Sequence, residues 1–389
     1  MMLCNAGYAS VERKFDSWRN IIRENYYGID GRLSISAGGY ASVYRAFDSQ
    51  GNVLQESYFG ADNEPVLINR CYATVKRAYS AFGKLTMEAY YDGENQLAEL
   101  PNRYAMVQNE YQGELLIQTT YYGADGQPMI GPYEYATVRY TYNELGLATE
   151  EAYFRPDGTS CYCDMRYAIK RMTYNGNGQV VSEAYFSDQL RSVRNVLGYA
   201  AVAKTYDDRG NLLMEQYLDT DGKPLMARAG YAAVQYTYDA NNRVLTMTYL
   251  DPLGQPSANG KGLGYASAAN TYDGKGDLVE QAFADAMGQP TRTFNGYSRI
   301  VRSYNAFHQV ARESYFDASG MPVRNGENGA YEVLRKYDER GGISEETLCD
   351  ASGNPMAGED GFARVTLKND SRGLPIYKAY FDGQGNSVT

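Results

Sequence analysis

Polar and apolar residues alternate in short runs along the whole chain. In residues 231–250, "YAAVQYTYDANNRVLTMTYL", the apolar positions Val234, Tyr236 and Tyr238 are each separated by one residue, and a second run ends at Leu250. Alternation of this kind, in segments rich in Tyr, Thr and Val, is typical of β-strands. The segment Asp-Ala-Asn-Asn between the runs is rich in turn-forming residues. The pattern therefore predicts a β-hairpin with a turn of about four residues.

The same phrase recurs about every 32 residues, and we number repeat positions from its first Tyr. The copies start at Tyr8, Tyr40, Tyr72, Tyr104, Tyr135, Tyr167, Tyr199, Tyr231, Tyr265 and Tyr297, with degenerate copies at Ala330 and Phe362. A lone hairpin is marginally stable in water, so the copies must stack to bury their aromatic faces. The sequence predicts an all-β repeat protein in which about twelve hairpin units form a single array over residues 1–389, stacked in an open superhelix or spiral.

A paired-helix repeat solenoid is the alternative. Tyr72, Val75 and Tyr79 also satisfy the spacing of one helix face, and the period is near that of paired-helix repeats. The central Gly and the Asn-rich and Asp-Gly breaks fall where helices would have to continue. The hairpin interpretation is therefore favoured.

Each copy closes with a second turn of the form Asp-x-x-Gly-x-Pro. The proline of this turn recurs at Pro65, Pro128, Pro224, Pro256, Pro290, Pro322 and Pro355. Because proline lacks an N–H donor, strand pairing is expected to end there. One copy is thus one hairpin followed by a crossing link.

Repeat positions 6 and 17 vary together. Position 17 is Glu in eight copies, and six of these have a basic residue at position 6, giving the candidate pairs Arg13 and Glu24, Arg45 and Glu56, Arg77 and Glu88, Lys204 and Glu215, Arg302 and Glu313, and Arg335 and Glu346. The other two, Glu151 and Glu183, have Arg139 and Arg171 one place earlier, and copies without the Glu lack a basic residue at either place.

This covariation predicts cross-strand ion pairs that set the hairpin register, each adding roughly 0.2 to 1 kcal/mol. A column of metal ligands or catalytic carboxylates is the alternative. If positions 6 and 17 face each other, Val43 faces Tyr58 and Val202 faces Tyr217.

Composition narrows the candidate functions. The chain has 39 Tyr and 40 Gly but one His, and its formal net charge is −10. An acidic chain is a poor partner for nucleic-acid phosphates, and no run of 18 apolar residues is present to span a membrane. The five cysteines are odd in number and fit no disulfide framework. We find no nucleophile with a matching base, no cofactor motif and no metal-ligand set, so we expect no enzyme, no cofactor and no metal.

The run "YDDRGNLL" at 206–213, with variants such as "YDANNRVL" and "YDERGGIS", resembles the YD repeats of the bacterial RHS and teneurin proteins. Those are hairpin repeats that wind into spiral β-shells. They have a shorter period than this chain, which adds a second turn and a link to each unit. The resemblance implies a bacterial protein that is extracellular or at the cell surface, and it supplies no catalytic residues. The chain also begins and ends almost directly on the repeat consensus, without the polar capping units that a solenoid usually needs, so we expect it to be a fragment of a longer protein.

Adjacent tyrosines are the candidate ligand-binding groups. Tyr26 and Tyr27, Tyr90 and Tyr91, and Tyr121 and Tyr122 put neighbouring rings on opposite faces of a strand. If one ring of each pair reaches solvent, it offers a face for sugars or cationic groups. The leading hypothesis is a non-catalytic binding or spacer region whose partner is a cell-wall or host glycan, or another protein. The alternatives are a purely structural shell or stalk and a protein–protein interaction scaffold, with both sets of rings in the core.

Overall fold

The computed structural model describes residues 6–101, 104–258, 262–370 and 372–388. These residues form β-strands, turns and links, and no helix occurs among them. The expectation of an all-β chain of repeated hairpins is confirmed, and the paired-helix alternative is wrong. The physical reason is the one the sequence offers: strand-forming Tyr, Thr and Val alternate over six or seven residues and then meet a turn.

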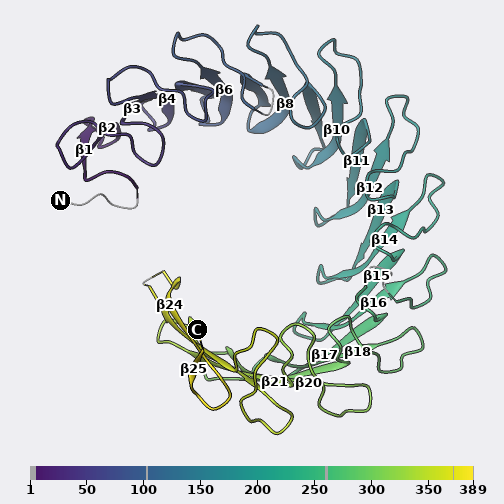
Figure 1. Cartoon of the computed structure of the whole chain (residues 1–389). Coiled ribbons are helices and arrows are strands. Elements are labelled where there is room, and N and C mark those ends of the chain that lie inside the picture. The colour runs from purple at the N-terminus through teal and green to yellow at the C-terminus, as the bar shows by residue number, and fades with distance from the viewer. Residues whose placement is uncertain (1–5, 102–103, 259–261, 371, 389) are drawn as a thin grey trace. The chain divides into compact units, whose positions relative to one another are not determined.

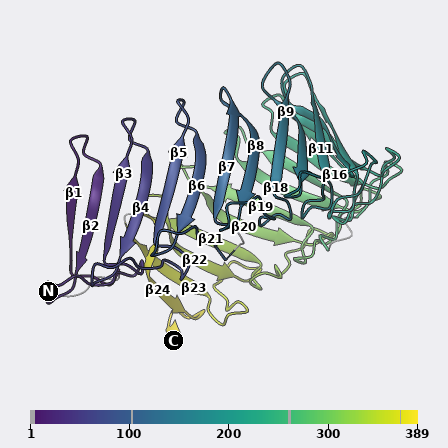
Figure 2. The same cartoon turned by 90° about the horizontal axis from the view of Figure 1, so that it is seen from above.

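The chain divides into two compact units, Met1–Val196 and Leu197–Thr389. The strands of the N-terminal unit are β1 (Ser10–Phe15), β2 (Ile21–Tyr27), β3 (Ser42–Phe47), β4 (Val53–Phe59), β5 (Thr74–Tyr79), β6 (Leu85–Tyr91), β7 (Met106–Gln112), β8 (Leu115–Tyr122), β9 (Thr137–Tyr142), β10 (Ala148–Phe154), β11 (Ile169–Tyr174) and β12 (Val180–Phe186). Figure 2 shows β1 to β8 standing side by side in chain order.

The C-terminal unit repeats the arrangement and is coloured from teal through green to yellow in Figure 1. Its strands are β13 (Ala201–Tyr206), β14 (Leu212–Leu218), β15 (Ala233–Tyr238), β16 (Val244–Leu250), β17 (Ser267–Tyr272), β18 (Leu278–Ala284), β19 (Arg299–Tyr304), β20 (Val310–Phe316), β21 (Glu332–Tyr337), β22 (Ile343–Cys349), β23 (Arg364–Asn369), β24 (Pro375–Phe381) and β25 (Ser387–Val388). The prediction of a single continuous array stays a prediction.

Within each unit every strand pairs antiparallel with the next strand in the chain. Pairing inside a hairpin covers the whole strand, as between β3 and β4, where Arg45 lies opposite Glu56 and Val43 opposite Tyr58. Pairing between hairpins is shorter, as between β4 and β5, where Glu56 lies opposite Val75. The register inside the hairpins is the one that the covariation predicts. Each unit is thus an open meander of strands.

An aspartate fixes the first turn in many copies, and Asn or Ser takes its place in others, as Asn143 and Ser80 do. Asp48 Oδ1 accepts hydrogen bonds from the backbone N–H groups of Gln50 and Asn52, at 2.9 and 2.8 Å. Gly51 follows with φ of +85°, a conformation that glycine adopts without strain. The Tyr-Asp-x-x-Gly motif therefore works as an Asx turn that closes the hairpin.

The second turn ends strand pairing at the recurring proline. Asp219 Oδ1 accepts from the backbone N–H groups of Asp221 and Lys223, and the chain then makes a single bridge between Leu218 and Pro224. All seven predicted prolines occupy bridges of this kind. Since proline cannot donate to a longer ladder, the chain leaves the sheet there and crosses to the next hairpin.

The tyrosine at repeat position 8 ties each hairpin to the one before it. Its hydroxyl donates to a backbone carbonyl 26 to 28 residues earlier, at 2.5 to 3.2 Å, in the pairs Tyr79 to Val53, Tyr111 to Leu85, Tyr142 to Leu116, Tyr174 to Ala148, Tyr238 to Leu212, Tyr272 to Val244, Tyr304 to Leu278 and Tyr337 to Val310. The carbonyl belongs to the start of the second strand of the preceding hairpin. The Tyr of the Tyr-Asp motif is thus a contact between copies.

Replacing one of these hydroxyls tests its contribution. Tyr304→Phe keeps the ring but removes the 2.8 Å bond to the carbonyl of Leu278. We expect the free energy of unfolding to fall by about 0.5 to 1.5 kcal/mol, the usual net value of one hydrogen bond. Urea unfolding measures it, with Tyr162→Phe as the control because that ring is 41% exposed. Equal effects of the two substitutions would contradict a role for the hydroxyl between hairpins.

Candidate functional site

The tyrosine rings at repeat positions 1 and 19 form a continuous stack in each unit, which we call the ring ladder. Consecutive ring centroids lie 4.6 to 6.2 Å apart in the N-terminal unit and 4.6 to 6.0 Å apart in the C-terminal unit. Its members are Tyr8, Tyr26, Tyr40, Tyr58, Tyr72, Tyr90, Tyr104, Tyr121, Tyr135, Tyr153, Tyr167 and Tyr185, and, in the second unit, Tyr199, Tyr217, Tyr231, Tyr249, Tyr265, Phe283, Tyr297 and Tyr315.

Three of the six candidate binding tyrosines, Tyr26, Tyr90 and Tyr121, belong to the ring ladder. Each ring packs between rings of its own and the following copy, as Tyr26 does between Tyr8 and Tyr40. Burial, with smaller effects from neighbouring Tyr40 and Glu24, raises the pKa of Tyr26 to about 12. These three rings are therefore in contact with other rings of the ladder.

The other three candidates, Tyr27, Tyr91 and Tyr122, lie on the opposite face of the sheet and are partly buried. The Tyr27 hydroxyl donates to Glu12 Oε2 at 3.0 Å, and Lys76 Nζ lies 4.1 Å from the centroid of the Tyr91 ring. The structure does not bring the six candidates together at one place. It distributes them between the two faces of three separate hairpins.

The charged residues at positions 6 and 17 form a second stack in the N-terminal unit, which we call the ion ladder. The nitrogen-to-oxygen distances are 2.8 Å for Arg13 and Glu24, 3.0 Å for Arg45 and Glu24, 3.0 Å for Arg45 and Glu56, 2.9 Å for Arg77 and Glu56, and 2.6 Å for Arg77 and Glu88. Each arginine after the first therefore bonds the glutamate of its own hairpin through Nε and that of the preceding hairpin through Nη1. The bond to the preceding hairpin is the part that the sequence did not predict.

The C-terminal unit carries a shorter ion ladder. Arg302 Nε lies 2.8 Å from Glu313, and Arg335 bonds Glu313 through Nη1 and Glu346 through Nε, both at 2.8 Å. Elsewhere in the unit Lys204 Nζ lies 3.4 Å from Glu215. A lysine ammonium lacks the planar fork of arginine, which holds two carboxylates at fixed angles.

The arginines keep the ladder carboxylates ionised. Burial alone would raise the pKa of Glu56, but hydrogen bonds from Arg77 and Arg45 outweigh it and hold that pKa below its usual value. The same balance, with burial opposed by two arginines, lowers the pKa values of Glu24 and Glu313. Both oxygens of each of these carboxylates are already bonded to arginine. Their charges therefore stabilise the packing of the hairpins.

The expected partners of Glu151 and Glu183 are wrong. Arg139 Nε donates to Gln118 Oε1 at 2.8 Å, and Arg171 Nε donates to Glu150 Oε2 at 2.7 Å. Successive side chains of a strand point to opposite faces, so a basic residue at position 5 cannot replace one at position 6.

Lys170, at position 4, takes the place of those arginines. Its Nζ lies 3.7 Å from Glu151 and 3.6 Å from Glu183, so it bridges two consecutive hairpins. Position 4 lies on the same face of the strand as position 6.

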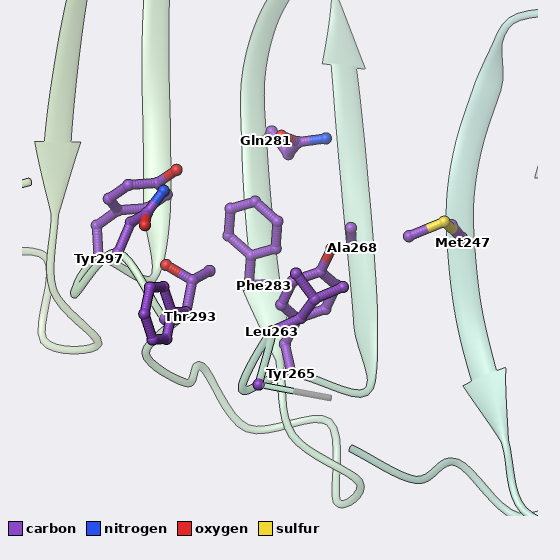
Figure 3. A pocket seen from close by; sticks show the side chains of 11 residues that line it. Met247, Leu263, Tyr265, Ala268, Gln281, Phe283, Thr293 and Tyr297 are labelled. Carbon is purple, nitrogen blue, oxygen red and sulfur yellow. The ribbon is translucent and has the colours of Figure 1, made fainter. Parts of the chain in front are cut away.

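The ion ladder is interrupted in the hairpins β15–β16 and β17–β18. Tyr236 lies opposite Met247, and Asn270 lies opposite Gln281, with Gln281 Nε2 donating to Asn270 Oδ1 at 3.0 Å. A pocket of about 440 Å³ opens at this interruption (Figure 3). In the sequence, Met247 and Gln281 mark two copies that lack the glutamate. That several departures from the repeat coincide at one place was not predicted.

The remaining reactive side chains show no assembled site. Cys71, Cys161, Cys163 and Cys349 are free, and burial raises the pKa of the last three thiols, which makes them poor nucleophiles. Cys4 lies outside the described residues. Among the residues that the structure describes, no group of three or more His, Cys, Asp or Glu is placed to hold a metal ion. The described part of the chain also contains no helix of the length and hydropathy needed to cross a membrane.

Comparison with known proteins gives limited similarity. No family model matches the sequence, and no curated protein matches it. Among solved structures, a TcdB2-TccC3-TEV crystal structure has a TM-score of 0.32 and 14% identity over 97% of this chain. TcdB2-TccC3 without its hypervariable C-terminal region has a TM-score of 0.31 and 12% identity over 96%. A porin-like protein from Bacteroides uniformis has a TM-score of 0.17 and 11% identity over 78% of this chain and 87% of its own.

This chain spans 17% and 20% of the length of the two TccC3-containing chains. TM-scores of this size do not establish a shared fold.

Removing one carboxylate tests the ion ladder. Glu56→Gln leaves the guanidinium groups of Arg45 and Arg77 facing a neutral amide. We expect the free energy of unfolding at pH 7 to fall by about 1.5 to 3 kcal/mol, the range for hydrogen bonds to charged groups. Urea unfolding measures it. The control, Glu114→Gln, removes a carboxylate that is 71% exposed and 3.8 Å from Lys84, and it should change stability by less than about 1 kcal/mol.

The same variant tests the pH dependence. The pKa of Glu56 is lower in the folded chain than its usual value of 4.5, so the carboxylate stabilises the fold above that value. This stabilisation is lost as pH falls through the folded pKa. We expect urea midpoints measured between pH 6 and pH 3 to fall less steeply for Glu56→Gln than for the wild type. Parallel curves would mean that Glu56 does not contribute to the acid sensitivity.

Proposed function

We propose that this chain is a non-catalytic structural repeat region, a spacer within a longer secreted or cell-surface protein. The observation that carries the proposal is that its recurring side chains are used between hairpins. The ring ladder, the ion ladder and the position-8 tyrosines each join one copy to the next. A side chain that packs against the neighbouring copy in every repeat has little surface left to contact a ligand.

The single histidine supports a non-catalytic role. His308 lies in a hairpin turn, and its Nδ1 is 2.9 Å from Asp277 Oδ1 in the turn of the preceding copy. Neither residue neighbours a Ser, Thr or Cys nucleophile in the described hydrogen bonds. The pair thus joins two turns, as other contacts between copies do, and the described contacts of His308 and Asp277 include no nucleophile of a catalytic triad.

The contacts also favour a spacer over glycan binding through the tyrosine pairs. Stacking on a sugar or a cation requires an open ring face. Tyr26, Tyr90 and Tyr121 lie against other rings, and Lys76 covers the face of Tyr91. Binding by these four rings would therefore have to disrupt contacts within and between the hairpins.

Deletion of one whole copy tests the spacer proposal. Removing residues 40–71 joins the first hairpin to the third. Arg77 then takes the place of Arg45 beside Glu24, so the ion ladder stays continuous. We expect a folded protein with the same circular dichroism per residue as the wild type, because each copy contacts only its neighbours. Deletion of residues 40–55, half of a copy, is the control and should unfold the N-terminal unit because it removes one strand of a hairpin. If both deletions unfold the protein, the copies are not modular.

A binding assay tests the alternative. The whole chain is mixed with purified cell wall, mucin and common polysaccharides at low and high salt. We expect no retention at high salt. Retention at high salt that is lost in Tyr91→Ala but kept in Tyr162→Ala would contradict the spacer proposal and indicate a glycan-binding function.

A further inference from the structure

One pocket of the C-terminal unit differs from the regular surface of the repeat. It lies over β16, β17 and β18 and the link that precedes β19, and its volume is about 440 Å³, within the range of small-molecule sites. Its lining includes Met247, Tyr265, Ala268, Gln281, Phe283 and Tyr297. In Figure 3, Phe283 lies between Tyr297 and Met247, with Gln281 further along the same strand.

The pocket exists because several repeat positions depart from their usual residue in one place. Repeat position 4 is a valine in most other copies, such as the buried Val75 and Val138, but it is Ala268 here. Ala268 lies opposite Met247 on one side and Phe283 on the other. The smaller side chain leaves space where a valine packs elsewhere, and the missing arginine and glutamates leave that space uncharged.

Apolar side chains line the mouth of the pocket. Phe294 is 83% exposed and Leu263 is 39% exposed, although both are large and apolar. The backbone N–H of Phe294 donates to the carbonyl of Leu263 at 3.0 Å, so the two rim residues are held next to each other. Exposed apolar residues that converge on a concave site are a feature of ligand-binding surfaces.

Two polar groups of the pocket lack protein partners. Gln281 Nε2 donates to Asn270 Oδ1, and Gln281 Oε1 has no partner among the described residues. The Thr293 hydroxyl, also in the pocket wall, is shielded from water and has no hydrogen-bond partner among the described residues. A ligand that supplies a donor to Gln281 Oε1 gains a hydrogen bond there.

The charge of the pocket restricts the ligand. Among the described residues that line the pocket there is no Asp, Glu, Lys or Arg, so a charged ligand would lose its hydration without an ionic partner from them. We propose that the pocket binds a neutral, ring-containing small molecule. Its apolar faces lie against Met247 and Leu263, and it donates one hydrogen bond to Gln281 Oε1. This site goes beyond the spacer function and does not depend on it.

Methyl NMR of the whole chain tests the proposal, with [methyl-¹³C]methionine labelling and the Met247 signal assigned through Met247→Leu. The probe is indole, a neutral ring with one N–H donor, and the matched probe is indene, which has a similar shape without the donor. We expect a saturable shift of the Met247 methyl signal with indole, and roughly tenfold weaker binding of indene, the effect of one hydrogen bond.

Two variants localise the binding. Ala268→Val restores the residue found in other copies, so we expect the fold to be kept and indole binding to be lost. Ala269→Val is the control, because it changes the next residue, which faces the other side of the sheet. Gln281→Leu should bring indole and indene to equal affinity.

Three results would overturn the proposal. They are no Met247 shift with indole, indole binding that survives Ala268→Val in a folded protein, or indene binding as tight as indole in the wild type.

Discussion

The contact between one hairpin and the next is the interaction on which the rest of the structure depends. A two-stranded hairpin has too little apolar surface to be stable alone. Here each hairpin bonds its neighbour through short strand pairing, through rings that alternate along the sheet, and through arginines such as Arg45, which hold glutamates of two copies. The backbone pairing between hairpins covers fewer residues than the pairing within them, so the side chains carry much of the attachment.

The two faces of the sheet use different chemistry for this attachment. One face carries the ring ladder and the ion ladder. On the other, basic side chains lie over aromatic rings, as Arg23 does over Tyr44 of the following hairpin at 4.3 Å. Because these roles are assigned by repeat position, a change at one position alters one contact and leaves the neighbouring copies intact. The pocket near Ala268 arises in this way, from substitutions that remove volume and charge from one face of a hairpin.

The sequence was enough to predict the hairpins, their turns and the register within them. Asp and Gly encode the turns locally, and the covariation of positions 6 and 17 reports on residues directly opposite each other, such as Arg45 and Glu56. It was not enough to predict that Arg45 also bonds Glu24, because a pairing within copies explains the covariation equally well. The misassigned partners Arg139 and Arg171 show the same limit, since a shift of one place along a strand reverses the face. The burial of the candidate tyrosines depends on how neighbouring copies dock, which a single copy does not encode.

A double-mutant cycle on Arg77 and Glu56 tests the attachment between hairpins most directly. The two residues belong to different copies, and their atoms lie 2.9 Å apart. The single variants Arg77→Met and Glu56→Gln and the double variant are compared with the wild type by urea unfolding at pH 7. We expect a coupling free energy of about 0.5 to 3 kcal/mol, as for residues in one hydrogen-bonded network. A coupling near zero would show that the arginine fork does not hold consecutive hairpins together.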